Sequence, residues 1–212
     1  MYIRQVRIVI IAILASLTLS SCEVIRVITH EVNLEPQDTL LGQYKIDSDH
    51  VSLIFKVNHF GFSNYVGRFN NVDAELNYDS KNPEKSKLIV KIKTSSIDSD
   101  NQLIDSQLKS AAFFNSEKFP YATFVSKEIS INGANTAKVS GELKVRDRKT
   151  LITLDVIFNG GGTNPLTQIE TLGFSASGSF KRSNIGLNSW FPAVGDTVLI
   201  DIEAEFIKNR KK

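Results

Sequence analysis

The sequence predicts an all-β protein, an antiparallel sheet of about eight strands closed into a barrel, with one short helix. Three observations lead to this prediction: apolar and polar residues alternate in many segments, turn residues separate these segments, and no helices recur between them. Alternation gives each strand one apolar face and one mostly wet face. Two sheets packed as a sandwich would alternate in the same way. The long strands favour a barrel, because an open sheet of that length would leave exposed edges.

The N-terminal segment, 1–21, differs from the rest and has the layout of a secretory signal peptide. Two arginines lie near the start, an apolar run follows at 8–19, and Ser20 and Ser21 precede Cys22. The apolar run is shorter than the ~20 residues that a membrane-spanning helix needs. We therefore expect this segment to direct export.

Leu19-Ser20-Ser21-Cys22 also resembles the bacterial lipobox, in which the cysteine is acylated and becomes the new N-terminus. Cys22 is the only cysteine, so it cannot form an internal disulfide. An ordinary signal peptide with a chance cysteine is the alternative. The lipobox predicts a periplasmic or cell-surface protein anchored to a bacterial membrane, with the outer membrane favoured, and residues 22–41 as its tether.

The charge of the chain gives no argument for nucleic-acid binding. The whole chain has 25 basic and 23 acidic residues. Removing the signal peptide takes away Arg4 and Arg7 and no acid, which leaves 23 of each. A domain with zero formal charge lacks the basic surface that nucleic-acid binding requires.

The predicted barrel domain spans residues 42–208. Five segments alternate with period two, at 51–57, 72–78, 139–145, 172–180 and 198–206. Three further strands are predicted at 87–94, 121–131 and 151–158. Turn chemistry is expected at Asn82-Pro83, Asn132-Gly133 and Gly160-Gly161-Gly162.

One segment, 99–112, breaks the alternation and predicts the helix. Ser99 is expected to cap it, and Gln102 three residues later would complete a capping box. The apolar face is marked by Ile104, Leu108 and Ala112. We expect this helix to close one end of the barrel or to lie across it.

Aromatic and small residues share the predicted inner face. Phenylalanines are spread over nearly every segment, and the small residues among them are Ala74, Gly141, Ala176, Gly178 and Ala204. An eight-stranded barrel can either fill with side chains or hold one ligand. The small residues could leave a long dry cavity suited to an acyl or prenyl chain. They could equally fit the taper of a filled, purely structural barrel.

Groups for catalysis are few. The sequence lacks a GxSxG elbow, a phosphate-binding loop, a dinucleotide fingerprint and a CxxC pair. Asp47, His50 and His59 could form an acid–base or metal site at one rim of the barrel, although Ser48 and Asp49 favour a polar turn there. We expect no enzyme, no cofactor and no metal. Six bases near the loops could meet a phosphate headgroup at a barrel mouth, although most of them are expected to be solvated surface charges: Arg68, Lys109, Arg146, Arg148, Lys149 and Arg182.

Several short motifs occur in a recognisable order. They are Tyr44-Lys45-Ile46-Asp47, F-K-V-N-H-F-G-F at 55–62, Gly67-Arg68-Phe69, Thr94-Ser95-Ser96-Ile97-Asp98, Leu108-Lys109-Ser110 with Phe113-Phe114, and F-P-Y-A-T-F at 119–124. Together they resemble the YceI-like family of lipid- and polyisoprenoid-binding proteins over residues 42–207. The chain departs from the family pattern at 105–109, where D-x-H-L-R is common, and at 147–151, where a G-V-T-K-P-like turn is common.

The resemblance implies an extended, lipocalin-like barrel, often dimeric, that binds or carries a long isoprenoid or similar amphiphile without a reaction. On this interpretation the ligand would be lined by Phe55, Phe60, Phe62, Phe113, Phe124, Phe174 and Trp190. His59 and Lys109 are the candidates for its polar end. Two hypotheses stay open beside it: a lipid-modifying enzyme that uses Asp47, His50 or His59, and a filled barrel without a ligand.

Overall fold

The computed structural model describes residues 30, 32–34 and 40–209, and the statements below concern these residues. The predicted signal peptide, Cys22 and most of the predicted tether lie outside them. The strands are β1 Gly42–His59, β2 Ser63–Phe69, β3 Val72–Tyr78, β4 Lys87–Lys93, β5 Ile97–Asp98, β6 Tyr121–Ile131, β7 Thr136–Val145, β8 Arg148–Thr163, β9 Glu170–Lys181 and β10 Val194–Lys208. A single α-helix is described, α2 Gln102–Lys109. In this part of the chain no helix is long and apolar enough to cross a membrane.

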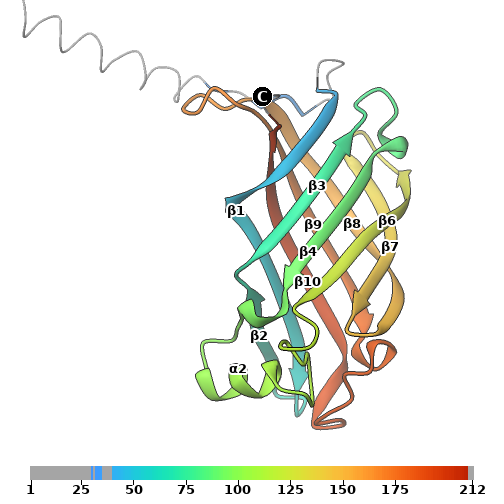
Figure 1. Cartoon of the computed structure of the whole chain (residues 1–212). Helices are drawn as coiled ribbons and strands as arrows, with labels where there is room; N and C mark the ends of the chain where they lie inside the picture. Colours follow the sequence, from blue (N-terminus) through green and yellow to red (C-terminus); the bar gives the residue numbers. More distant parts are fainter. Residues whose placement is uncertain (1–29, 31, 35–39, 210–212) are drawn as a thin grey trace, which may run out of the picture.

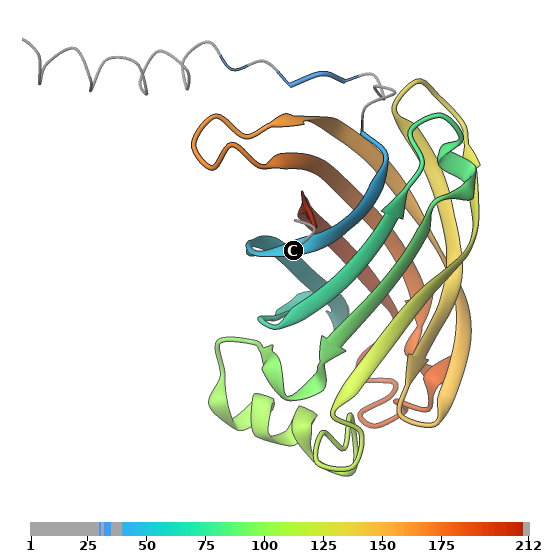
Figure 2. The same ribbon diagram turned by 45° about the horizontal axis from the view of Figure 1, so that its top comes forward.

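The strands form one closed antiparallel barrel (Figures 1 and 2). Neighbours follow the order β3, β4, β6, β7, β8, β9, β10, and β1 closes the ring by pairing with both β10 and β3. β2 pairs with the second half of β1 and β3 with its first half, so these two short strands together fill one position in the wall. The predicted eight-stranded barrel with one helix is therefore confirmed.

The barrel has two ends, which we call upper and lower as drawn in Figure 1. At the upper end lie the β3–β4, β6–β7 and β8–β9 connections and the start of β1. At the lower end lie the β1–β2 turn, α2, the β7–β8 turn and the β9–β10 loop. The two ends are built differently, and this difference determines the geometry of the interior.

The predicted alternation is present in the strands, which are longer than the alternating segments. β1 begins at Gly42, well before the predicted segment 51–57, and β8 extends on both sides of 151–158. β2 was missed by the prediction. Its sequence, SNYVGRF, has several polar residues and faces the outside with Val66, which is exposed.

The predicted helix cap was wrong. The side-chain oxygen of Asn101 accepts hydrogen bonds from the backbone N–H groups of Leu103 and Ile104, so α2 begins at Gln102. Ser99 instead bonds to Asp105 Oδ1 through its backbone N–H and its hydroxyl, at 2.9 and 2.6 Å. Ser99 therefore bonds to an acidic side chain inside the helix and does not cap the helix.

The triple glycine is not the β8–β9 turn either, because it belongs to β8 and the chain turns at 164–169. Gly160 follows a β-bulge and has φ of 124°. A Cβ on Gly160 would lie 2.9 Å from the carbonyl oxygen of Asn33, and one on Gly161 would lie 2.7 Å from the Leu40 side chain. These glycines let the segment before β1 pack on the barrel, where Asn33 pairs with Gly161 and Leu40 is buried.

Candidate functional site: two apolar cavities in line

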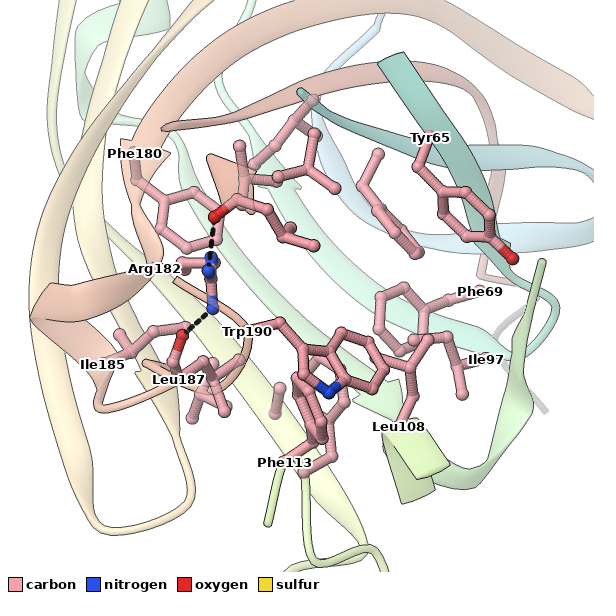
Figure 3. Close-up of a pocket in the computed structure, with 18 of the residues that line it drawn as sticks. Tyr65, Phe69, Ile97, Leu108, Phe113, Phe180, Arg182, Ile185, Leu187 and Trp190 are labelled. Carbon is pink, nitrogen blue, oxygen red and sulfur yellow. Dashed lines mark hydrogen bonds between the residues drawn. The ribbon is translucent and has the colours of Figure 1, made fainter. Parts of the chain in front are cut away.

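The lower half of the barrel encloses a cavity of about 540 Å³. Inward-facing residues of β1 and β10 form one wall, among them Phe55, Val57 and Val198. The helix α2 lies at the lower end (Figure 1) and lines the cavity with Ile104 and Leu108. Figure 3 labels Leu108 among the lining side chains. The lining is almost wholly apolar, and besides the indole of Trp190 its polar side chains are His59, Tyr65, Gln107 and Arg182.

Aromatic rings surround this cavity and pack at steep angles to one another. Phe69 lies 5.8 Å from Phe55 and 5.6 Å from Phe114 between ring centroids. The Phe113 and Trp190 rings are 4.4 Å apart, which joins the segment after α2 to the β9–β10 loop (Figure 3). Aromatic contacts of this kind stabilise the fold by more than the burial of their surface area alone would. They hold the cavity walls apart without filling the space between them.

The loop that carries Trp190 is held by one buried guanidinium, that of Arg182. Its side chain donates four hydrogen bonds to backbone carbonyl oxygens, those of Leu187, Ser189, Val194 and Gly195. Arg182 is 5% exposed, and burial lowers the pKa of its guanidinium. The sequence predicts that most bases of this kind are solvated, because it gives no sign that a charge at the end of a strand is buried.

A second cavity of about 230 Å³ lies above the first. Ala74, Ala176 and Ala204 are among its lining residues, together with Phe124 and Phe174. Four residues line both cavities and mark the boundary between them: Leu53, Ile92, Leu143 and Ile200. The two cavities therefore follow each other along the barrel.

The predicted small residues act in two different ways. The three alanines line the upper cavity, as the cavity interpretation expected. Gly141 and Gly178 instead make room for neighbouring side chains: a Cβ would lie 2.4 Å from the Phe124 ring and 2.8 Å from Leu154, respectively. Part of the small-residue pattern thus accommodates core packing, as the filled-barrel alternative proposed.

A cluster of aromatic rings packs at the upper end, where Phe174 is partly buried and the other rings are buried. The upper cavity still reaches the β6–β7 turn at this end, where Gly133 and Ala134 line it. Phe158 and Phe174 are 5.4 Å apart, Tyr78 stacks on Phe158 at 6.1 Å, and Phe206 lies 5.9 Å from Phe174. Tyr44 is fully buried beside them. Its hydroxyl donates to Glu170, which also accepts a 2.7 Å hydrogen bond from Lys208 Nζ. Burial and the hydrogen bond to Glu170 raise the pKa of Tyr44 well above its ordinary value.

The predicted ligand residues are distributed over both cavities. Phe55, His59, Phe60, Phe113 and Trp190 line the lower cavity. Phe124 and Phe174 line the upper one. Phe62 and Lys109 line neither, and Phe62 is 90% exposed on the β1–β2 turn. The prediction missed Tyr65, Phe69 and Ile97, because β2 carries several polar residues and does not alternate clearly, and β5 has only two residues.

The candidates for proton transfer do not meet in one place. His50 Nδ1 lies 3.0 Å from Asp47 Oδ2, but both residues belong to the bulge of β1 between Ile46 and Val51. His59 is at the other end of the same long strand. The group of Asp47, His50 and Glu205 has ligand atoms within 4.8 Å of one another and could hold a cation. None of the three lines either of the in-line cavities.

Comparison with known proteins matches this barrel to one family. The YceI-like domain matches residues 44–206. A UPF0312 protein of Pseudomonas putida is 32% identical over 180 residues, which are 84% of this chain and 92% of that protein. A Campylobacter jejuni YCEI protein has a TM-score of 0.65 at 29% identity, covering 73% of this chain and 91% of that one.

A third match concerns the fold alone. A polyisoprenoid-binding domain from Saccharophagus degradans has a TM-score of 0.61 at 12% identity, covering 80% of this chain and 99% of that domain. The family match covers nearly the whole described domain, and the closed barrel with a single helix at its lower end is consistent with it. The chain belongs to the YceI-like family.

Proposed function

We propose that this protein binds or carries a long apolar lipid, a polyisoprenoid or similar amphiphile, inside its barrel, without a catalytic step. The observation that carries the proposal is the pair of apolar cavities in line along the barrel. The larger, lower cavity is lined by exposed Phe60 and Trp190 at its end, and the upper one by exposed residues of the β6–β7 turn. The likeness to a domain described as polyisoprenoid-binding supports it. The chain would enter from the lower end and point its tail toward the ring cluster.

The energetics of such binding are favourable. Burying one CH₂ group contributes about 0.8 kcal/mol. A chain of a few isoprene units therefore offsets the ~4–15 kcal/mol that association costs. Because apolar contacts are non-directional, the barrel would select the length and width of the chain. Few polar groups are available, so the headgroup would lie near His59, Tyr65 and Gln107 at the lower end.

The outer-wall group of Asp47, His50 and Glu205 favours no second function. It lies on the bulge of β1 and its partner strand, and none of its members lines either in-line cavity. His50 and Glu205 line a separate hollow, which shares Phe174 and Ala204 with the upper cavity. A lipid held in the barrel would not contact it. The lipid-modifying hypothesis would therefore need a substrate bound on the outside.

The proposal includes location. We expect export, cleavage before Cys22, acylation of Cys22, and attachment to a bacterial membrane with the barrel in the periplasm or at the cell surface. Fractionation of cells that express the chain and mass spectrometry of the protein in the membrane fraction test this: the mature chain should begin at an acylated Cys22. A chain in that fraction with an unmodified Cys22 would contradict the anchor.

A titration with a prenyl alcohol tests the binding proposal. Trp190 is the only tryptophan in the chain and lines the lower cavity, so its fluorescence should change as geranylgeraniol binds. Ala122 is buried and lines the same cavity, so Ala122→Phe should fill it and weaken binding by at least about tenfold. Ala111→Phe adds the same ring at an exposed position and serves as the control. Equal affinity for both variants would contradict the proposal.

A further inference from the structure

The exposed aromatic side chains of the described residues all lie at the lower end. Phe62 is 90% exposed, Phe191 64%, Phe60 60%, Tyr121 54% and Trp190 41%. The upper end buries its aromatic rings in the cluster around Phe158 instead. Exposed aromatic groups gathered at one end of a barrel indicate a contact surface.

Two adjacent turns form the tip of this surface. The backbone N–H of Phe60, in the β1–β2 turn, donates a 2.8 Å hydrogen bond to the carbonyl of Ala193, in the β9–β10 loop. Phe60 and Trp190 are exposed and also line the lower cavity. Apolar surface therefore continues from the outside of the tip into the barrel.

The backbone holds these rings in strained conformations. Phe60 and Trp190 have positive φ angles of 52° and 65°, in the left-handed region that bulky residues rarely adopt. The buried Arg182 side chain fixes the same loop and the start of β10 through four carbonyl oxygens. Such strain persists only where the surrounding structure enforces it, and it concentrates at functional positions.

The tip carries no formal charge. Residues 183–195 contain no Lys, Arg, Asp or Glu, and neither do residues 57–67, where His59 is the one titratable side chain besides Tyr65. Charged groups are costly to bury in hydrocarbon, while aromatic side chains favour the boundary between lipid and water. The surface thus has the chemistry of a segment that enters a membrane without electrostatic attraction.

We propose that the lower end docks on a lipid bilayer, with Phe62 and Phe191 inserted, and that the cavity exchanges its lipid there. This inference rests on the proposed function, because a lipid carrier must take its ligand from a membrane or deliver it to one. Docking would place the mouth of the cavity against hydrocarbon, so the ligand would not cross water. Since the tip is uncharged, docking would not require anionic lipids.

Vesicle flotation and Trp190 quenching test the proposal. The full chain with Cys22→Ser, which cannot be acylated at residue 22, is mixed with phosphatidylcholine vesicles whose acyl chains are brominated. We expect the protein to float with the vesicles and the fluorescence of Trp190 to be quenched. Adding phosphatidylglycerol should leave both results unchanged.

The decisive variant is Phe62→Ser with Phe191→Ser, because neither side chain lines a cavity. It should reduce vesicle partitioning at least about tenfold, since two aromatic side chains no longer leave water. It should keep its affinity for geranylgeraniol added directly from solvent. The control is Ile157→Ser with Leu166→Ser, which removes exposed apolar groups of 45% and 71% exposure on the outer wall and at the upper end.

The outcomes separate the docking proposal from the proposed function. If the tip variant floats and is quenched like the control, the docking proposal is overturned, and binding through residues 1–21 would explain the flotation. Self-association of the wild type without quenching would also overturn it, because the tip would then contact a second copy. Failure of wild type and tip variant alike to bind geranylgeraniol would instead contradict the proposed function.

Discussion

The two ends of this barrel use aromatic residues in opposite ways. At the upper end, five rings pack on one another within 6.4 Å, in a cluster that also contains Leu40 and Leu172. At the lower end, the aromatic side chains are divided between the cavity wall and the exterior. The upper rings pack on one another as core, whereas the lower rings form a wall that surrounds space.

The difference shows that aromatic content alone does not tell core from site. The upper rings lie on long strands, where successive side chains alternate between inside and outside. Most of the lower rings lie on turns and short elements, where the backbone sets their direction residue by residue. The predictions below test this division, from the largest expected effect to the smallest.

The largest effect is expected from removing a ring of the upper end. Phe158→Ala leaves a cavity among closely packed rings. It should lower the free energy of unfolding by about 3–5 kcal/mol. Phe62→Ala at the exposed tip should leave that free energy almost unchanged, because the ring it removes packs on little. Urea denaturation measures both, and similar losses for the two variants would show that the tip is packed as tightly as the core.

The next effect concerns the length of the bound chain. Ala176→Phe places a ring in the upper cavity only, so a short prenyl alcohol held in the lower cavity should bind as in the wild type. A polyprenol long enough to reach past Leu53 should lose about tenfold in affinity, or ~1.4 kcal/mol. Competition titrations with alcohols of increasing length measure this. Equal losses at every length would contradict two cavities in line.

Alkaline pH should weaken the upper end. Burial and the bond to Glu170 raise the pKa of Tyr44 above its ordinary value of 10.0, so the folded protein keeps this proton where the unfolded chain releases it. The resulting stability is complete below pH 10 and is lost as pH rises further. Tyr78, whose pKa burial also raises, contributes in the same direction. The slope of unfolding free energy against pH above 10 should therefore be smaller in Tyr44→Phe, and an unchanged slope would argue against this assignment.

The smallest effect is expected at the outer bulge. The hydrogen bond to Asp47 raises the pKa of His50, so the stability from this pair is present at acidic to neutral pH and is lost as pH rises through the folded pKa of His50. Partial burial raises the pKa of Asp47, but the bond from His50, the bond from the Asp49 backbone N–H and the nearby positive charges together outweigh it and lower that pKa, so the pair also weakens as pH falls through it. His50→Ala should cost no more than the ~0–1 kcal/mol of an exposed pair and should leave lipid affinity unchanged. A loss of lipid affinity would support the hypothesis of a lipid-modifying enzyme that uses Asp47 or His50.

Much of this fold could be predicted from the sequence, because strand alternation is a local property. Val72 to Tyr78 alternates strictly and does line the upper cavity with every second residue. Phe55, Phe124 and Phe174 were found in the same way. The closed ring of eight positions followed from the number and length of such segments.

The rest depended on contacts between distant segments. The side chain of Arg182 is buried only because the β9–β10 loop and the start of β10 place carbonyl oxygens around its guanidinium. The glycines of β8 reflect packing against Asn33 and Leu40, which lie far earlier in the chain. Phe62 followed the apolar pattern of its motif but faces water, because a turn does not keep the alternation of the strand before it.

The most direct test of the central claim is mass spectrometry of the full chain, isolated from a bacterial host under native conditions and again after organic extraction. The account predicts one long-chain apolar lipid per protein, lost from the Ala122→Phe variant and kept in Ala111→Phe. Wild-type protein that carries no lipid, and takes up none when polyprenol is added, would contradict the account and favour a barrel without a ligand.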